Sequence, residues 1–82
     1  MEYDNIRFSN HAKQRLEERN IKEQWVIDTL QNPDAKEIKS ENEVHFFKQI
    51  FEFAKRYLKV VFNPMKNLVV TAYFDRSKTK AQ

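Results

Sequence analysis

Cysteine and glycine are both absent from the 82-residue sequence, and proline occurs only twice. Without cysteine the chain has no disulfide, no thiolate metal ligand and no thiol nucleophile, and this absence favours the cytoplasm. Without glycine, turns depend on other residues that tolerate a tight backbone, chiefly asparagine. The chain therefore relies on a small hydrophobic core, which stabilises by only a few kcal/mol and leaves room for a partner.

Long apolar runs are missing as well. No stretch approaches the roughly 20 apolar residues that a membrane-spanning helix needs. The first residues lack the basic and then apolar order of a signal peptide. There are no repeats, low-complexity tracts or linkers, so we predict one cytoplasmic domain over residues 1–76 and a disordered basic tail over residues 77–82.

Charge is unevenly spread along the chain. Residues 1–43 carry seven Lys or Arg against ten Asp or Glu, whereas residues 44–82 carry eight against two. A basic half of this kind attracts nucleic acid or an acidic protein segment. The alternative is that its lysines keep edge strands soluble, and charge alone does not decide between the two.

Residues 9–21 organise the chain, because they place His11, Arg15 and Arg19 four residues apart on a predicted helix. Side chains at this spacing lie on one face of a helix. Ser9 suits the N-cap, and Asn20 tolerates the left-handed backbone at the helix end. The shared face would carry one group that exchanges a proton near neutral pH and two planar cations suited to phosphate.

A second helix is predicted over residues 22–31, where apolar residues recur at helical spacing before Asn32 and Pro33 stop it. Beyond this point the pattern changes to the period of two that is typical of strands. It predicts four strands, over residues 35–39, 44–51, 56–62 and 68–74. Residues 3–8 form either a short strand or an extended arm.

This order of elements, with short connections, indicates an α+β domain in which two N-terminal helices pack on one face of a four-stranded antiparallel meander. On the last strand, Leu68, Val70, Ala72 and Phe74 are expected to share a face. The uncovered face of the sheet would display aromatic, basic and hydroxyl side chains at alternate positions.

Several motifs in this sequence resemble those of a known family. They are Ser9-Asn10-His11-Ala12-x-x-Arg15-Leu16-x-x-Arg19-Asn20-Ile21, Leu30-x-Asn32-Pro33, Arg56-Tyr57-Leu58-Lys59-Val60-Val61 and Val70-Thr71-Ala72-Tyr73-Phe74-Asp75-Arg76. Over residues 8–76 the sequence resembles domain-of-unknown-function family four-two-five-eight, which is grouped with the RelE/ParE-like toxin superfamily. The resemblance implies a RelE-like fold and a small basic toxin of a toxin–antitoxin pair. Many such toxins cut messenger RNA without a metal, and others of the same fold inhibit DNA gyrase.

The motif positions suit RNA cleavage by transesterification. A base removes the proton of a ribose 2′-hydroxyl, cations stabilise the charge that builds on phosphorus, and an acid protonates the leaving 5′-oxygen. The predicted catalytic residues are His11, Arg15, Arg19 and Tyr73. The predicted RNA-binding residues are Lys48, His45, Arg56 and Arg76. We expect no cofactor and no metal site, because the two histidines lack supporting carboxylate spacing.

Structural interpretations of the same residues stay open. The two helix arginines would then pair with carboxylates such as Glu18, and His11 would bond to backbone or pack under the sheet. The second functional hypothesis is a non-catalytic module of the same fold that binds protein or nucleic acid, including a gyrase-inhibiting toxin. Under the first hypothesis the partners are RNA, free or on the ribosome, and a cognate antitoxin protein. The sequence leaves the oligomeric state and the RNA sequence preference undetermined.

Overall fold

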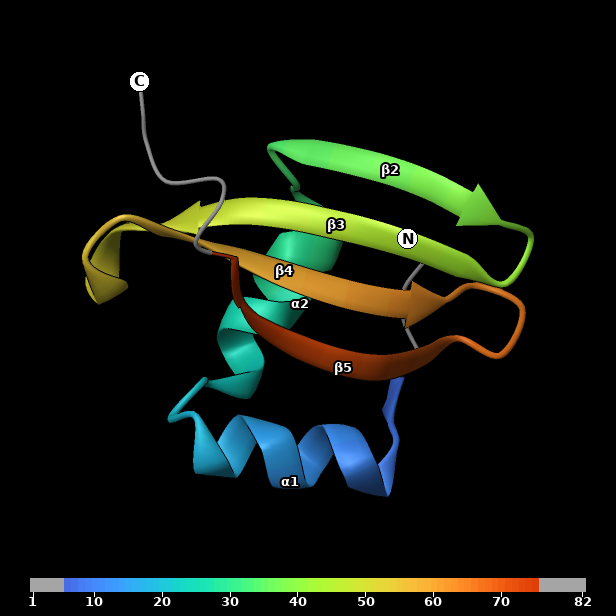
Figure 1. The fold of residues 1–82 in the computed structure, drawn as a ribbon, viewed down its shortest axis with the longest axis horizontal. Helices are drawn as coiled ribbons and strands as arrows, with labels where there is room; N and C mark the ends of the chain where they lie inside the picture. The colour runs from blue at the N-terminus through green and yellow to red at the C-terminus, as the bar shows by residue number, and fades with distance from the viewer. Residues whose placement is uncertain (1–5, 76–82) are drawn as a thin grey trace.

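The computed structural model of the chain describes residues 6–75. In Figure 1 these residues form β1 (Arg7–Phe8), α1 (Asn10–Glu18), α2 (Glu23–Gln31), β2 (Ala35–Ser40), β3 (Glu43–Ile50), β4 (Arg56–Asn63) and β5 (Leu68–Asp75). A single 3₁₀ turn, η1 (Phe51–Phe53), connects β3 with β4. Arg76, the predicted tail over residues 77–82 and the start of the predicted N-terminal strand or arm lie outside the described residues.

The strands form one mixed sheet in the order β1-β5-β4-β3-β2. Strands β2 to β5 are antiparallel neighbours in chain order, while β1 adds a parallel pairing with β5 at Arg7↔Leu68 and Phe8↔Val69. The α+β class is therefore confirmed. The sheet has five strands and not the predicted four, because the segment before the first helix joins β5 in parallel.

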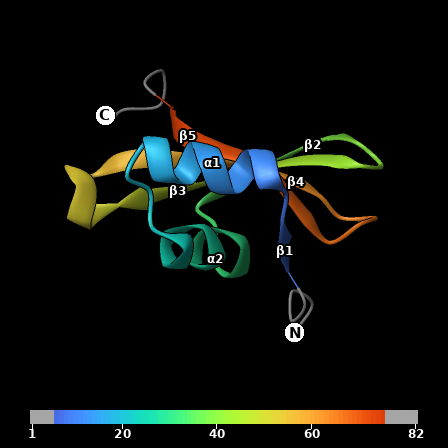
Figure 2. The same cartoon turned by 90° about the horizontal axis from the view of Figure 1, so that it is seen from below.

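The two helices lie on different parts of the sheet (Figures 1 and 2). α2 packs against β3 and β4 on one face, whereas α1 runs alongside β5 at the sheet edge. Ser9 fixes the start of α1 there, because its N–H donates to the carbonyl of Val69 at 3.2 Å and its hydroxyl donates to the carbonyl of Val70 at 3.3 Å. These bonds hold α1 at the edge of β5, from where Ala12 and Leu16 join the same core cluster as the side chains of α2.

Buried and less buried side chains alternate along β4, and the buried ones form the centre of the core. Leu58, Val60 and Phe62 are buried and point toward the helices, where Ala12 and Leu16 of α1 and several α2 side chains meet them. The α2 contribution consists of Trp25, Val26 and Leu30. Burial of these apolar side chains is the main favourable term in folding a domain of this size.

We call the sheet face opposite α2 the open face. Within residues 6–75 no helix covers it, and it faces the viewer in Figure 1. By strand register it carries alternate residues of β3, β4 and β5: His45, Phe47, Gln49, Tyr57, Lys59, Val61, Thr71, Tyr73 and Asp75. The predicted mixture of aromatic, basic and hydroxyl groups is present on this face.

β5 departs from the predicted alternation. Val61 pairs with Thr71 and Phe62 pairs with Val69, so Val70 is an extra residue between the two pairs. Val69 is consequently buried and Val70 is exposed, and the prediction that Val70 shares a face with Ala72 and Phe74 was wrong. A bulge of this kind inserts one residue and changes the face of every residue on one side of it.

Asparagine and alanine take the backbone conformations that glycine usually supplies. Asn20 follows α1 with φ 56°, as predicted, and Ala54 and Lys55 after η1 have φ 56° and 57°. The side chain of Gln49 donates to the carbonyl of Lys55 at 2.9 Å and holds this turn. Two successive left-handed residues with a Cβ store strain in the β3–β4 connection.

Replacing Ala54 with glycine is expected to raise the free energy of unfolding by about 0.5–1 kcal/mol, because relief of left-handed strain outweighs the added entropy of the unfolded chain. The same substitution at Ala12, inside α1, is expected to lower it by about 1 kcal/mol. Urea unfolding followed by Trp25 fluorescence compares the two variants. Equal destabilisation by both would show that the turn is unstrained.

Candidate nucleic-acid interface

α1 presents the predicted basic face. His11 and Arg15 lie four residues apart on α1 and Arg19, its C-cap, follows four residues later, while the neighbouring Ala12 and Leu16 are buried. His11 and Arg19 are exposed and Arg15 is half-buried. The imidazole is therefore accessible to a ligand and is not enclosed by apolar side chains.

Arg19 connects this face with β5. Its Nη1 donates to the carbonyl of Ala72 at 2.8 Å, and its guanidinium carbon lies 5.7 Å from the centroid of the Tyr73 ring. Tyr73 belongs to the open face. One guanidinium is thus fixed at the rim of that face, with several N–H groups remaining for an anion.

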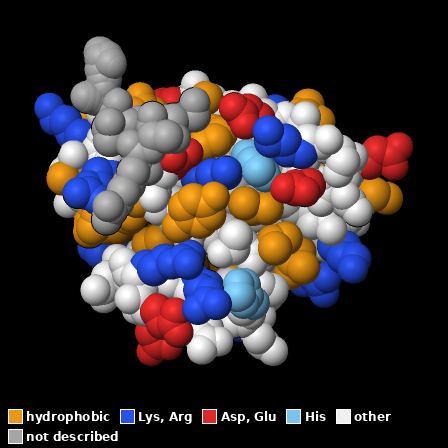
Figure 3. Space-filling model, in the orientation of Figure 1, with side chains coloured by type: hydrophobic (Ala, Val, Ile, Leu, Met, Phe, Trp, Pro, Cys, Tyr) orange, Lys and Arg blue, Asp and Glu red, His pale blue; other side chains and the backbone are white. Residues whose placement is uncertain are grey.

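Lys59 approaches the same ring from the neighbouring strand. Its Nζ lies 5.4 Å from the Tyr73 centroid and 5.8 Å from the centroid of Phe47, and β4 pairs Lys59 with both residues. We define the α1–β5 strip as His11, Arg15, Arg19, Tyr73 and Lys59. In Figure 3, Lys and Arg side chains and one histidine border apolar side chains in the region between α1 and the centre of the sheet.

Lys59 was not among the predicted site residues, although a signal for it existed. Side chains alternate along β4, so a strand with Leu58, Val60 and Phe62 on one face has Lys59 on the other. A lysine at such a position is equally consistent with a binding residue and with a residue that keeps the strand soluble. Only the pairing with Tyr73 across the sheet reveals its place in the strip.

Arg15 forms an ion pair within its own helix. Its Nη1 lies 2.9 Å from Oε1 of Glu18, one of the structural partners that the sequence offered. Both side chains are more than a third exposed, at 37% and 49%. An exposed pair of this type contributes little stability, so a phosphate can replace the carboxylate at small cost.

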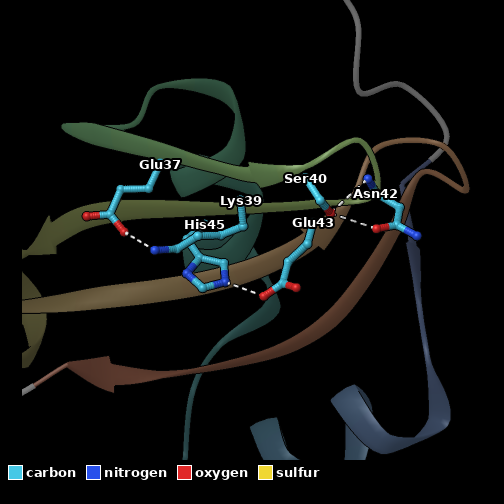
Figure 4. A network of polar contacts seen from close by, with 6 residues as sticks. All are labelled: Glu37, Lys39, Ser40, Asn42, Glu43 and His45. Carbon is cyan, nitrogen blue, oxygen red and sulfur yellow. Dashed lines mark hydrogen bonds and ion pairs between the residues drawn. The ribbon is translucent and has the colours of Figure 1, made fainter.

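His45 lies on the open face but outside the strip (Figure 4). It is only 8% exposed, and its Nε2 shares a hydrogen bond of 2.7 Å with Oε2 of Glu43. Its Nδ1 is buried without a hydrogen-bond partner among the described residues. Next to it, Lys39 pairs with Glu37 at 3.3 Å across the bulged end of β2.

The two histidines do not share one binding position. β4 and β5 separate His45 on β3 from α1, and strands lie about 4.8 Å apart, so His11 and His45 are more than about 9 Å apart. In Figure 3 the two pale-blue side chains stand apart on the same face. His45 therefore does not join His11 at one phosphate.

The remaining predicted RNA-binding residues lie elsewhere. Lys48 is on the helix side of the sheet and donates to the carbonyl of Asn32 at 3.0 Å, at the end of α2. Arg56 is exposed at the start of β4 opposite Ile50, beside η1. Arg76 lies beyond residue 75 and has no described position.

The fold and the strip together define a small α+β domain with a basic and aromatic face. A family model described as "Domain of unknown function (DUF4258)" matches residues 8–74, and the chain belongs to this family. The match spans all five residues of the strip. Searches of curated proteins and of solved structures found no match.

Two further structural findings concern the described residues only. No helix within residues 6–75 is long and apolar enough to cross a membrane. In the same part of the chain, His, Asp and Glu side chains form no group of three or more that could hold a metal ion.

Proposed function

We propose that this protein is an endoribonuclease that cleaves RNA by 2′-hydroxyl transesterification without a metal ion, and that it is the toxin of a toxin–antitoxin pair. The observation that carries the proposal is the placement of Arg19 and Lys59 on the Tyr73 ring, with the exposed His11 on the same helix face about 12 Å along α1 from Arg19. The toxin role rests on the resemblance to the RelE/ParE-like superfamily.

Phosphate binding is the first requirement, and the strip supplies it. A guanidinium binds phosphate through two parallel hydrogen bonds, and an ammonium adds a compact positive charge. The guanidinium of Arg19 donates one hydrogen bond to the carbonyl of Ala72, and Arg15 forms one exposed ion pair with Glu18. Both arginines can therefore donate hydrogen bonds from their remaining N–H groups to an RNA backbone that crosses from α1 to β4.

Proton transfer is the second requirement. One group takes the proton from the 2′-hydroxyl, the O2′–P bond forms, and the P–O5′ bond breaks as another group gives its proton to O5′. The products are a 2′,3′-cyclic phosphate and a 5′-hydroxyl. We assign one of these roles to His11, because its imidazole is exposed and can both accept and donate a proton, and the other to Tyr73 or Lys59.

One observation favours the second candidate, a non-catalytic binding module that includes a gyrase-inhibiting toxin. Arg15 and Arg19 both have structural contacts, with Glu18 and with the carbonyl of Ala72. Such contacts hold a docking surface in place without chemistry. The same strip would then bind a nucleic acid or protein and leave it intact.

The test is cleavage of defined RNA by the purified protein in EDTA, with and without ribosomes, together with mapping of new 5′-ends in a bacterial host that expresses the chain. We expect discrete cuts that leave 2′,3′-cyclic phosphates. A substrate with a single 2′-deoxy nucleotide at the mapped cut should resist cleavage, because it lacks the nucleophile. Cleavage of that substrate would refute the mechanism, and growth arrest without new 5′-ends would favour the binding module.

A further inference from the structure

The β3–β4 connection carries an aromatic ring that the fold leaves in solvent. Phe51, the first residue of η1, is 71% exposed, and Phe53, two residues on, stacks on Phe74 at a centroid distance of 4.3 Å. The indole of Trp25 donates to the carboxylate of Glu52 at 2.9 Å. η1 is therefore anchored on its inner side by Phe53 and Glu52, and this anchoring turns Phe51 outward.

One cationic side chain borders the exposed ring, and a second follows it in the chain. Nζ of Lys55 lies 6.0 Å from its centroid, and the exposed Arg56 follows, opposite Ile50 in the sheet. The nearest carboxylate in sequence, Glu52, is engaged by Trp25. The β3–β4 connection thus combines one exposed ring with the positive charges of Lys55 and Arg56 and the negative charge of Glu52, which the Trp25 indole holds.

This combination suits a particular kind of partner. A docking site for a protein helix or strand needs a contiguous apolar patch, and here the neighbours Glu52, Ala54 and Lys55 are exposed and small or charged. An unpaired nucleobase needs only one aromatic face, with cations nearby for the flanking phosphates. The left-handed backbone at Ala54 and Lys55 fixes the turn that brings ring and charges together.

We propose that Phe51, Lys55 and Arg56 form a second RNA contact, in which Phe51 stacks on an unpaired base and the two cations bind adjoining phosphates. This inference rests on the proposed function and adds to it a preference for single-stranded RNA. A base in a duplex is already stacked on both sides and cannot reach the ring without melting the helix.

The test measures binding of a labelled single-stranded 2′-O-methyl RNA of about 12 nucleotides, which cannot undergo the proposed cleavage. Phe51→Ala is expected to weaken binding about 10-fold, and Phe51→Trp to preserve it, because base stacking needs a planar ring. Phe51→Leu, which keeps apolar bulk without a planar ring, should behave like Phe51→Ala. Lys55→Ala should reduce the slope of log affinity against log salt concentration by about 0.7.

Met65 provides a matched control, because it is also 71% exposed but lies in the turn at the other end of β4. Met65→Ala should leave binding unchanged. Wild-type affinity in Phe51→Ala or Phe51→Leu, combined with weaker binding in Lys59→Ala, would overturn this inference and leave the proposed function standing. A wild-type chain that binds no RNA would overturn both. Dimerisation of the wild type that Phe51→Ala abolishes would assign the ring to contact between copies of the chain and overturn the inference.

Discussion

Replacing His11 with alanine is expected to lower the rate of RNA cleavage about 100- to 10,000-fold, the range that general acid–base catalysis contributes. His11 is the one imidazole that lies on the same helix face as Arg15 and Arg19, and it is exposed. RNA binding should weaken much less than cleavage, since the cations of the strip remain. Single-turnover cleavage with saturating protein separates the two effects.

Lys13→Ala is the matched control for this experiment. Lys13 is an exposed cation on the same helix, two residues from His11 and hence on another face. It should lose little activity. Circular dichroism should show that both variants are folded, because neither side chain is buried. Cleavage by folded His11→Ala at the wild-type rate would remove His11 from the mechanism and direct attention to Tyr73 and Lys59.

Replacing Phe62 with alanine is expected to lower the free energy of unfolding by about 3–5 kcal/mol, the usual cost of emptying a buried aromatic site. Phe62 is 1% exposed and contacts Phe46 edge to face at a centroid distance of 6.0 Å. Since a domain of this length has a total stability on the order of 4–12 kcal/mol, much of the stability would be lost. Urea unfolding measures the change as a lower midpoint.

Phe51→Ala removes the same side chain from a solvent-exposed position and should change stability by no more than about 0.5 kcal/mol. The pair therefore compares one substitution at two degrees of burial. A loss of similar size in both variants would mean that η1 packs against the core in solution. A small loss in Phe62→Ala would mean that the core collapses into the space left by the ring.

Local sequence signals predicted the elements that depend on local physics. The Ser9 hydroxyl accepts from the N–H of Ala12 at 2.9 Å, as an N-cap should, and the spacing of His11, Arg15 and Arg19 gave the helix face. The period of two predicted a strand over residues 56–62, in which Leu58, Val60 and Phe62 share a face, and the structure buries all three.

Other features depend on contacts between residues far apart in the chain, and these were not predictable from local pattern. The parallel pairing of β1 with β5 joins residues about sixty positions apart, and a two-residue strand carries no periodicity of its own. At the bulge Phe62 pairs with Val69 and Val61 pairs with Thr71, so Val70 is an extra residue in β5. The alternation of apolar residues in β5 alone predicts an unbroken register. The contacts of Arg19 and Lys59 with Tyr73 likewise follow from tertiary structure.

The position of α1 also bears on how the protein behaves at high concentration. Open strand edges invite pairing with other chains and hence aggregation. The outer edge of β5 is occupied by β1 and by donors from Ser9 and Arg19 to the carbonyls of Val70 and Ala72. At the opposite edge, β2 is fully exposed but has a register shift beyond Ile38 and charged residues at positions 36, 37 and 39. One edge is thus covered and the other is bent and charged, so the sheet resists growth by strand addition although half of its surface is uncovered by helices.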